Sequence, residues 1–476
     1  MVAEGYALAD AVADLAAAGI GVSTAVATAA GWQPVDPTGL DRTINGARLD
    51  SRRIGRDELF VALPGPRAHG REFTGDALAA GAVALTDRLP YAAAPEGSVV
   101  LTVDDPLGAL ATLAGSWRAR LPVRVIGITG SNGKTTTKDL LRAALASSGP
   151  IHATSGNLNS EQGVPLTLLG LRPEHRLAVI EMGASAVGHI AGRAALARPE
   201  VGVITNAAAA HLAEFGDLER IIEGKGELVA VLPENGVAVL NADSPGYADW
   251  RRRIRCRLVS WGRQAGDHRW AWKPGDRTAA GWLELDGERW PVPLPGRHNA
   301  ANLVAAILAA RAVGTADDDI RAGLDGFVPS PHRAHLRRLA GRLLLDDAYN
   351  ANPTSVVAAA RMLADLRGGR AYAVLGHMAE LGPDSDRLHR ECGASLAALD
   401  LAALVTVGDE AGPLAEGHEA SGGATVRCDD PAAAAAWLDA HTGEDDRILL
   451  KGSRSAAMER VLDVLQEAHG WTEDAP

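Results

Sequence analysis

The fold follows from one stretch of sequence, Val123-Arg-Val-Ile-Gly-Ile-Thr-Gly-Ser-Asn-Gly-Lys134-Thr135. Its apolar first half, up to Ile128, is rich in β-branched residues and predicts a buried parallel strand. The segment that follows the glycines has the apolar spacing of a helix. A loop between such a strand and helix presents backbone N–H groups at the positive end of the helix, where a polyphosphate can bind.

The loop residues match the parts of a nucleotide site. Gly130 and Gly133 let the backbone approach the phosphates, Lys134 can reach the β- and γ-phosphates, and the Thr135 hydroxyl is placed to coordinate Mg²⁺. Ile128 stands where the strict P-loop pattern has glycine. A glycine turn beside a surface lysine is the alternative, but the flanking strand and helix favour a site for ATP or GTP.

Length and composition narrow the class of protein. A chain of 476 residues favours about three domains. Its net charge of −12 argues against a protein that mainly binds nucleic acid. The three cysteines have no disulfide or zinc spacing. Because the chain lacks a signal-peptide pattern and any apolar run of about 20 residues, we expect a cytoplasmic enzyme without membrane insertion.

The N-terminal part predicts a small α/β unit. Residues 1 to 40 are rich in alanine and predict one or two short helices. Strands are expected at 59–63, 82–86 and 99–103, with a linker helix around 107–121. The polar loop that contains Ser51 and Arg52 is, by itself, most simply a solvated turn.

Polar side chains follow two apolar strands after the nucleotide loop. Glu181 ends the strand 177–180, and His211 follows the strand 201–205, so both are expected at the rim where parallel sheets bind ligands. A carboxylate and an imidazole beside a triphosphate can hold Mg²⁺, although His211 can equally be a hydrogen-bonded structural residue. Asn157 and Asn159 lie in a loop rich in glycine and amides.

Lys225 lies in a predicted helix between two glycines. A glycine inside a helix costs about 1 kcal/mol against alanine, so the pattern indicates that something needs close access to this lysine. Further on, residues 250–290 combine arginines with tryptophans, a mixture that can indicate nucleic-acid binding. The acidic chain and the alternation of the arginines along a predicted strand favour a solvated antiparallel face instead.

A proline-containing break at 328–331 precedes a third α/β series. Strands at 343–345, 372–375, 404–407 and 448–450 alternate with helices, which predicts a doubly wound sheet. The predicted fold class is therefore α/β with three domains: a small N-terminal α/β domain (1–120), a central P-loop ATPase domain with a mostly parallel sheet (121–328), and a C-terminal doubly wound, Rossmann-like domain (329–476). This C-terminal region contains no G-x-G-x-x-G pattern, so a dinucleotide-binding role is not indicated.

Taken in order, the motifs resemble the Mur ligase family of peptidoglycan synthesis over nearly the whole chain. The residues that carry this resemblance are Asp50-Ser-Arg52, Thr129-Gly-Ser-Asn-Gly-Lys-Thr135, Asn157-Leu-Asn159, Gly163-Val-Pro165, Glu181-Met-Gly183, Ala210-His-Leu212, Lys225-Gly-Glu227, Gly296-Arg-His-Asn299, Asp347-Ala-Tyr-Asn-Ala-Asn-Pro353, Met378-Ala-Glu-Leu-Gly382 and Lys451-Gly-Ser-Arg-Ser455.

The resemblance implies an ATP-dependent, ADP-forming amide ligase. In this family ATP phosphorylates a carboxylate of a UDP-sugar peptide, and an amine then attacks the acyl phosphate. The Tyr-Asn-Ala-Asn-Pro and Met-Ala-Glu-Leu-Gly runs are similar to the branch that joins D-alanyl-D-alanine to UDP-N-acetylmuramoyl-tripeptide. By this resemblance the N-terminal domain binds the UDP-substrate, the central domain binds ATP, and the C-terminal domain binds the incoming dipeptide. We expect a monomer.

The resemblance also implies roles for single residues. Lys134, Lys225 and His211 would be catalytic. One Mg²⁺ would be held by Thr135 and Glu181, and a second by His211 with Lys225 in a carbamylated form. ATP would contact Gly130, Ser131, Asn132, Gly133, Lys134, Thr135, Thr136, Asn299, Arg333 and Asp347. The substrates would contact Ser51, Arg52, Asn157, Asn159, Asn350, Lys451 and Ser453.

Two positions depart from the family pattern. His377 stands where the family usually has aspartate, and residues 331–334 replace a more common Gly-Arg-Met run.

Three other functions are alternatives to this one. The first is a paralogue that joins a different amine. A folylpolyglutamate-type ligase is disfavoured by the N-terminal unit with its Asp50-Ser-Arg52 motif. A nucleotide-dependent switch is disfavoured by the joint presence of Lys134, Glu181, His211 and Lys225.

Overall fold

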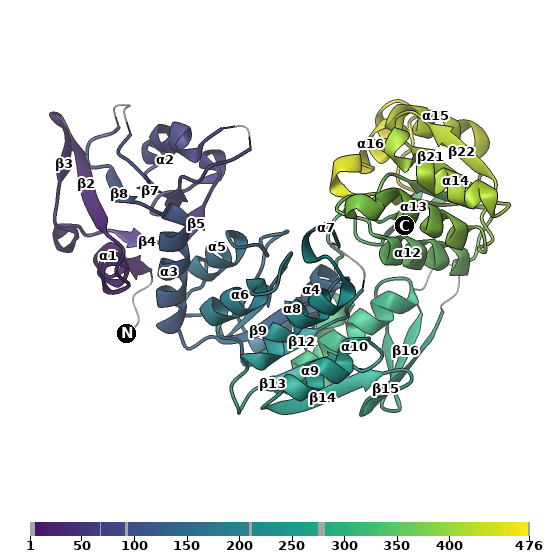
Figure 1. Cartoon of the computed structure of the whole chain (residues 1–476), viewed down its shortest axis with the longest axis horizontal. Helices are drawn as coiled ribbons and strands as arrows, with labels where there is room; N and C mark the ends of the chain where they lie inside the picture. The colour runs from purple at the N-terminus through teal and green to yellow at the C-terminus, as the bar shows by residue number, and fades with distance from the viewer. Residues whose placement is uncertain (1–4, 67, 91–93, 209–211, 275–280, 475–476) are drawn as a thin grey trace.

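The computed structural model describes residues 5–66, 68–90, 94–208, 212–274 and 281–474. It confirms the predicted α/β class, with parallel strands dominating the larger sheets. Figure 1 shows the N-terminal and C-terminal parts as two lobes on opposite sides of a middle part. In the described residues, no helix is both long and apolar enough to cross a membrane.

The N-terminal lobe contains a six-stranded sheet in the order β3-β2-β8-β7-β6-β5 and a small two-stranded sheet of β1 and β4. Its elements are β1 (Tyr6–Ala7), α1 (Leu8–Ala17), β2 (Val22–Thr28), β3 (Gly31–Pro34), β4 (Thr43–Ile44), β5 (Ala47–Arg48), β6 (Leu59–Val61), α2 (Thr74–Ala79), β7 (Val83–Thr86), β8 (Val99–Val103) and α3 (Pro106–Ala119).

Residues 1 to 40 contain a helix, as predicted, but also a hairpin that was not predicted. α1 is a helix, but β2 and β3 form an antiparallel hairpin, and β2 also pairs with β8. The alanines of this region favour a helix by propensity, whereas the valines and threonines between them suit a strand. Pairing with the apolar β8 outweighs the local preference.

The middle part contains a nine-stranded sheet in the order β10-β11-β9-β12-β13-β14-β15-β16-β17. Its elements are β9 (Arg124–Thr129), α4 (Lys134–Ala144), β10 (Ile151–Ala153), α5 (Gly163–Leu169), β11 (Leu177–Glu181), α6 (His189–Ala197), β12 (Val201–Ile204), α7 (Leu212–Phe215), α8 (Leu218–Ala230), β13 (Val237–Asn241), α9 (Tyr247–Arg253), β14 (Arg257–Gly262), β15 (His268–Lys273), β16 (Trp282–Leu285), β17 (Glu288–Pro291), α10 (Arg297–Ala312) and α11 (Asp317–Asp325).

The register of this sheet brings the carboxyl ends of its central strands to one edge. Glu181 at the end of β11 pairs with Ile128 of β9, and Ile204 at the end of β12 pairs with Thr129. The strands from β10 to β15 are parallel, and β15 to β17 continue the sheet as an antiparallel extension. The loop after β9 is therefore flanked by the residues that follow β11 and β12.

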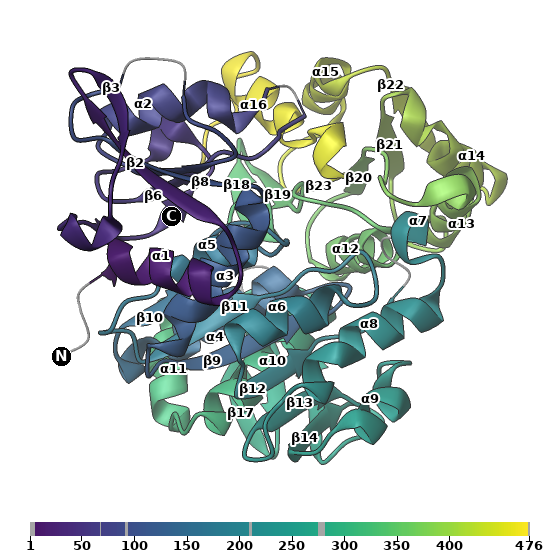
Figure 2. The ribbon, with the colours of Figure 1, turned by 60° about the vertical axis from the view of Figure 1, so that its left-hand side comes forward.

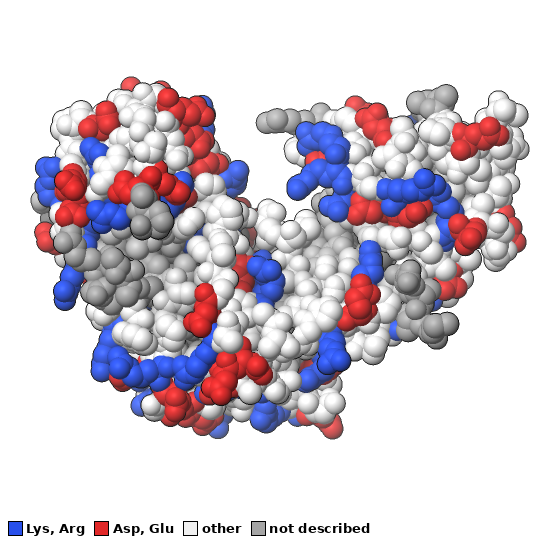
Figure 3. Space-filling model, turned by 180° about the vertical axis from the view of Figure 1, so that it is seen from behind, with Lys and Arg blue, Asp and Glu red and all other residues white. Residues whose placement is uncertain are grey.

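The predicted arginine-bearing strand near residue 251 was wrong. Arg252 and Arg253 lie on helix α9, and β14 begins only at Arg257. Asp249 pairs with both arginines at helical spacings of three and four residues, an arrangement that supports a helix. On the face shown in Figure 3, positive and negative side chains are interspersed.

Helices cover both faces of the middle sheet. Val125 points to one face and packs with α3, α5, α6 and α8, while Ile126 points to the other and packs with α4 and α10. The first of these cores runs without a break into the N-terminal lobe through Leu110 and Trp117 of α3. The N-terminal lobe and the middle part thus share one apolar core.

The C-terminal lobe contains a six-stranded sheet in the order β18-β19-β23-β20-β21-β22. Its elements are β18 (His335–Leu339), β19 (Arg342–Asp346), α12 (Pro353–Asp365), β20 (Ala371–Leu375), α13 (Ser385–Leu396), β21 (Ala403–Val407), α14 (Gly412–Ala420), β22 (Thr425–Cys428), α15 (Pro431–His441), β23 (Arg447–Lys451) and α16 (Glu459–Glu467). Helices α12 to α14 cover one face, and α15 and α16 cover the other.

The neighbouring strands β20 and β23 continue to opposite faces of this sheet, since α13 follows β20 and α16 follows β23. Such a reversal creates a crevice at the carboxyl ends of the two strands. The predicted doubly wound arrangement is therefore present. The domain boundaries at residues 120 and 328 stay predictions.

The C-terminal lobe meets the middle part through polar contacts. Asn352 Nδ2 donates to Asn132 Oδ1 over 2.7 Å, and Ser330 Oγ donates to Asp139 Oδ2 over 2.6 Å. The apolar cores of the C-terminal lobe contain residues of that lobe alone. Figure 2 shows α12 above the middle part, and Figure 3 shows a broad notch between the two outer lobes.

Candidate active site

The loop between β9 and α4 has the backbone conformation that its glycines predict. Gly130 and Gly133 have φ values of 146° and 79°. A Cβ on Gly130 would collide with Thr205 Oγ1, and one on Gly133 would collide with Asn302 Oδ1. Both positions therefore require glycine, because neighbouring side chains close in on a left-handed backbone.

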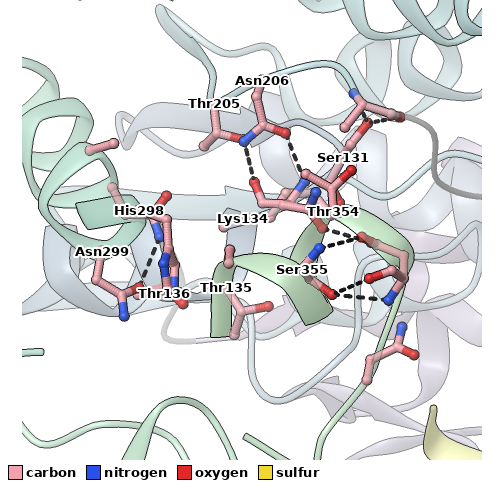
Figure 4. A pocket seen from close by; sticks show the side chains of 18 of the residues that line it. Ser131, Lys134, Thr135, Thr136, Thr205, Asn206, His298, Asn299, Thr354 and Ser355 are labelled. Atoms are coloured by element: carbon pink, nitrogen blue, oxygen red, sulfur yellow. Dashed lines mark hydrogen bonds between the residues drawn. The ribbon is translucent and has the colours of Figure 1, made fainter. Parts of the chain in front are cut away.

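The residues after β12 hold this loop in place. Thr205 Oγ1 donates to the carbonyl of Asn132 over 2.6 Å, and the amide of Asn132 donates to Asn206 Oδ1 over 3.0 Å. Ser131 Oγ donates to the carbonyl of Ala208. Figure 4 shows Thr205 and Asn206 beside Ser131 and Lys134. Sequence reasoning missed Thr205 and Asn206, although their place after an apolar parallel strand was a usable signal.

Lys134 lies where its ammonium group can reach a bound anion. Nζ donates to the carbonyl oxygens of Gly130 and Ser131 over 2.8 and 3.2 Å. Burial lowers the pKa of Lys134; the Glu181 carboxylate opposes this effect, and the Arg333 guanidinium adds to it. Lys134, Thr135 and Thr136 line a cavity of about 560 Å³ between the middle part and the C-terminal lobe.

Glu181 has the features of a metal ligand. It is 1% exposed, and its Oε1 accepts a hydrogen bond from Asn159 Nδ2 over 2.6 Å. Its Oε2 is buried without a hydrogen-bond partner among the described residues. Both Glu181 and Thr135 line the cavity. A buried carboxylate oxygen without a partner, near a hydroxyl, is a donor set that fits a hard divalent cation such as Mg²⁺.

Lys225 is a buried amine on α8. It is 1% exposed, Nζ lies 3.4 Å from the carbonyl oxygen of Ala184, and the ring centroid of Phe215 is 5.2 Å away. Burial lowers its pKa well below the usual range; Lys134 and Arg193 lower it further, and only Glu227 opposes them. Lys225 thus lies behind the cavity wall that Ala184 forms, close enough to Lys134 for the charge of Lys134 to lower its pKa.

The glycines beside Lys225 have a different cause from the predicted one. A Cβ on Gly224 would lie 3.0 Å from the Phe215 ring, and one on Gly226 would lie 2.8 Å from Trp250. These glycines let α8 pack closely against two aromatic side chains, so the interpretation that they give open access to Lys225 was wrong. Gly163, predicted to lie in a loop, instead begins α5.

Helix α10 closes one side of the cavity. Asn299 is in its first turn as predicted, is 2% exposed, and donates through Nδ2 to the carbonyl of Pro295 over 2.8 Å. Asn302 Nδ2 donates to Asn299 Oδ1. His298 also lines the cavity, and burial lowers its pKa to about 4. Sequence reasoning quoted His298 inside a motif but assigned it no role.

The C-terminal lobe brings charged residues to the same cavity. Lys451 Nζ lies 2.6 Å from Asp347 Oδ2 and donates to the carbonyl of Asn350 over 2.8 Å. The Arg333 guanidinium lies over the ring of Tyr349, with 3.9 Å to its centroid. These five residues line the cavity opposite the nucleotide loop. The contact between Asn352 and Asn132, which sequence reasoning missed, joins the two sides directly.

The segment that departs from the family pattern lies in this wall. His332 and Ala334 have positive φ values of 60° and 50°. His332 Nδ1 lies 2.9 Å from Asp346 Oδ2, and the Ala334 amide donates to Asp347 Oδ1 over 3.1 Å. Although residues 331–334 depart from the family pattern, their backbone keeps Arg333 in the lining of the cavity.

Most of the predicted site residues line this one cavity, and a few lie elsewhere. Asn157 and Asn159 line it beside Glu181. Ser51 and Arg52 lie in the N-terminal lobe outside the lining, and Arg52 forms an ion pair with Asp50. Ser453 lies outside the lining as well, and His211 lies outside the described residues.

The described residues contain no cluster of three or more His, Cys, Asp or Glu side chains that could hold a metal ion. Mg²⁺ prefers one or two carboxylates combined with hydroxyl, water and phosphate oxygens, and Glu181 with Thr135 fits that preference.

Two family models match the chain: the Mur ligase middle domain at residues 128–310, and the Mur ligase, glutamate ligase domain at residues 332–454. The UDP-N-acetylmuramoyl-tripeptide--D-alanyl-D-alanine ligase of Escherichia coli (strain K12) is 38% identical over 449 residues, with 90% of this chain and 95% of the relative covered.

Solved structures give the same result. MurF from Acinetobacter baumannii has a TM-score of 0.80 at 32% identity and covers 90% of this chain and 94% of its own. MurF ligase from Thermotoga maritima in complex with ADP has a TM-score of 0.76 at 30% identity, with coverages of 89% and 97%.

Proposed function

The chain belongs to the Mur ligase family, and from this premise we propose that it joins D-alanyl-D-alanine to UDP-N-acetylmuramoyl-tripeptide. It is an ATP-dependent, ADP-forming ligase of peptidoglycan precursor synthesis. The observation that carries the proposal is the single cavity, in which Lys134, Glu181 and Lys451 from two parts of the chain face one another.

The reaction proceeds in two steps. The γ-phosphoryl group of ATP passes to a substrate carboxylate, which gives ADP and an acyl phosphate with a good leaving group. The amine then attacks the acyl carbon, the C–O bond to phosphate breaks, and phosphate leaves with the electron pair. Because charge gathers on the transferring phosphoryl group, fixed cations and N–H donors supply most of the stabilisation.

In this proposal the nucleotide loop binds the phosphates of ATP. The amides of residues 133 to 136 surround the phosphates, since those of Ser131 and Asn132 donate to Asn206. Lys134 exchanges its carbonyl partners for the β- and γ-oxygens. Asn299 contacts the adenine, and Arg333 and Asp347 approach the nucleotide from the C-terminal lobe. The left-handed glycines and the cavity lining support this placement.

We place one Mg²⁺ at Thr135 and Glu181 and a second at His211 and carbamylated Lys225. Such ions, when bound, neutralise the phosphate charge and polarise the transferring group. The unpartnered Oε2 of Glu181 supports the first assignment. His211 lies outside the described residues, so its role rests on the resemblance alone.

The environment of Lys225 supports the carbamate. An ammonium group with 1% exposure, with Lys134 and Arg193 as electrostatic neighbours, is unfavourable. A lowered pKa favours the neutral amine, which is the form that attacks CO₂. Carbamylation converts an unfavourable cation into an anion that two cations and a metal can stabilise.

The substrates are placed on the remaining polar residues. Asn157 and Asn159 face the reacting end of the UDP-substrate, and Ser51 and Arg52 bind its distal part across the notch. The incoming dipeptide is bound by Asn350, Lys451 and Ser453. By this proposal the regions 1–120, 121–328 and 329–476 bind the UDP-substrate, ATP and the dipeptide, and the chain acts as a monomer.

Phosphate release tests the proposal. A ligase releases phosphate in quantity only when ATP, UDP-N-acetylmuramoyl-tripeptide and D-alanyl-D-alanine are all present, whereas a nucleotide switch hydrolyses ATP slowly whatever amine is added. A panel of other amines separates the proposed dipeptide from a different acceptor. Phosphate release that does not depend on any amine would contradict the proposal.

A further inference from the structure

A second cavity of about 560 Å³ lies in the C-terminal lobe, lined by residues that follow β20 and β21 and by residues of α13. Four of its lining residues are acidic: Glu380, Asp386, Asp409 and Glu410. Its lining, as far as the structure describes it, contains neither lysine nor arginine. Such a cavity attracts positive charge.

A chain of hydrogen bonds ends at this cavity. Glu410 Oε2 lies 2.9 Å from His377 Nδ1, His377 Nε2 lies 2.8 Å from Ser455 Oγ, and Ser455 Oγ lies 3.1 Å from Ser453 Oγ. Ser453 is 1% exposed, whereas the Glu410 side chain is 75% exposed. The chain thus connects a buried hydroxyl with the surface.

The inner end of this chain of hydrogen bonds lies two residues along the sequence from the ligation cavity, the cavity lined by Lys134, Glu181 and Lys451. Ser453 follows Lys451 by two residues at the end of β23, and Lys451 lines the ligation cavity. The Ser453 amide donates to the carbonyl of His377 over 2.9 Å, which joins the loops after β23 and β20. The segment after β23 therefore connects Lys451, which lines the first cavity, with His377, which lines the second.

The chemistry of the groups orients every bond in one direction. A carboxylate can only accept, so Nδ1 of His377 carries the proton that faces Glu410. In the neutral imidazole Nε2 must then accept the Ser455 hydroxyl proton, and Ser455 in turn accepts from Ser453. With its own proton directed to Ser455, the Ser453 oxygen keeps acceptor capacity for a further proton.

We propose that Ser453, Ser455, His377 and Glu410 form a relay that carries the proton released by the incoming amine out of the ligation cavity. This inference rests on the proposed function. The amine enters as an ammonium and must lose a proton before its electron pair attacks the acyl carbon. That N–H bond breaks, the proton passes to Ser453, each hydroxyl passes its own proton onward, and His377 Nε2 receives one.

The surroundings of His377 favour a transient positive charge. Glu410 follows β21, Ser455 follows β23, and Asp386 lies on α13 beside His389. Glu380 and Asp409 complete the acidic lining. His389 Nε2 accepts the Met378 amide over 2.9 Å, and burial lowers the pKa of His389, so this second imidazole holds the loop as a neutral acceptor.

The test uses the full-length enzyme with ATP, UDP-N-acetylmuramoyl-tripeptide and D-alanyl-D-alanine, and measures kcat for phosphate release from about pH 5 to pH 9. His377→Gln should lower kcat at neutral pH by roughly tenfold to a hundredfold and flatten the acid limb of the profile, because a proton acceptor is lost. His377→Asp should regain part of the rate and move that limb to lower pH, because carboxylates titrate lower than imidazoles.

Two further variants separate the relay from a structural role. Ser455→Ala should slow the reaction much as His377→Gln does. Asp409→Asn removes one of four acidic charges of the cavity but no hydrogen bond of the relay, so it should lower kcat by no more than about twofold and keep the shape of the profile. The burst of ADP formed without amine should be unchanged in all of them, which shows that they fold and bind ATP.

The outcomes of the two proposals differ. A His377→Gln enzyme that keeps the unmodified acid limb, or an Asp409→Asn enzyme as slow as Ser455→Ala, overturns the relay while ligation stands. Failure of the unmodified enzyme to release phosphate in response to any amine overturns the proposed function and the relay with it.

Discussion

Lys225 and Lys138 are both buried lysines of the middle part, but their surroundings differ. Lys138 Nζ lies 3.0 Å from Asp139 Oδ1 and donates to the Thr154 carbonyl over 2.9 Å, so its charge is compensated. Lys225 Nζ lies 3.4 Å from the Ala184 carbonyl oxygen and over the Phe215 ring, with the cations Lys134 and Arg193 and the anion Glu227 as electrostatic neighbours. The structure describes no ion pair of Lys225 like that of Lys138, so the two residues should respond differently to the same substitution.

Lys225→Ala should reduce ligation by roughly a hundredfold or more, since a group that stabilises the transferring phosphoryl is lost. Added formate or acetate should restore part of the activity by occupying the place of the carbamate. The measurement is phosphate release against carboxylate concentration, with Lys138→Ala as the control that the carboxylates should not rescue. Unchanged activity of Lys225→Ala would show that the carbamate assignment is wrong.

Glu181→Gln should raise the Mg²⁺ concentration for half-maximal activity by roughly tenfold or more, because the buried oxygen loses its negative charge. The amide oxygen can still accept the Asn159 hydrogen bond, so folding should be little affected. A Mg²⁺ titration of phosphate release checks this. An unchanged Mg²⁺ requirement would show that Glu181 is not a ligand of the ion.

At the scale of the element, the loop between β9 and α4 depends on the close fit of its glycines against neighbouring side chains. Gly133→Ala should weaken ATP binding by at least about tenfold and lower the free energy of unfolding by about 1–2 kcal/mol, because an alanine there meets both a left-handed backbone and Asn302. Gly188→Ala is a matched control: its φ is 94°, but nothing lies within 4 Å of the added Cβ.

Gly188→Ala should therefore lose some stability and keep its affinity for ATP. Calorimetric titration with ATP and urea unfolding measure the two effects separately. Equal ATP affinity in both variants would mean that the Asn302 contact does not shape the loop.

The pairing of β10 with α5 predicts a dependence of stability on pH. His152 Nε2 lies 2.8 Å from the Thr167 carbonyl, and burial, aided by His175, lowers the pKa of His152 to about 4 from 6.5. Between these values the unfolded chain binds more protons, so stability is full above about pH 6.5 and falls as the pH drops toward 4.

His152→Gln should reduce the loss of unfolding free energy between pH 7 and pH 4.5 by about 1–2 kcal/mol, a figure discounted for the half-buried position of the ring. Urea unfolding at the two pH values gives the difference. An equal loss in both proteins would exclude this histidine as the cause.

Elements with strong apolar patterns could be predicted, and weak ones could not. The strands β9, β11 and β20 are continuous apolar runs. Glu181 at the end of β11 lines the same cavity as the loop after β9, as expected from its place at the end of a parallel strand. β2 and α9 were not foreseen, because pairing with β8 and ion pairs to Asp249 decided them. The roles of Thr205, His298 and Asn352 depend on contacts between distant segments, which a pattern along one chain does not contain.

At the scale of the whole molecule, the difference between the two junctions predicts which part moves. The N-terminal lobe shares an apolar core with the middle part, whereas the C-terminal lobe is joined to it by Asn352, Ser330 and the linker near residue 330. A shared core resists relative motion, and a polar junction permits it. Closure should therefore move the C-terminal lobe.

Small-angle X-ray scattering should show a smaller radius of gyration when a non-hydrolysable ATP analogue and UDP-N-acetylmuramoyl-tripeptide are added together. Either ligand alone should give a smaller change, because each contacts part of the notch. A radius that stays constant with both ligands would indicate that the enzyme works in its open arrangement.

The polar junction between the middle part and the C-terminal lobe has a thermodynamic consequence. When amide and hydroxyl contacts separate, water replaces each lost partner, and no apolar core is divided, since the cores of the middle part and of the C-terminal lobe are separate. The heat-capacity change of opening is then small, because exposure of apolar surface dominates that quantity. The balance between open and closed molecules should accordingly drift little between a cold and a warm cell.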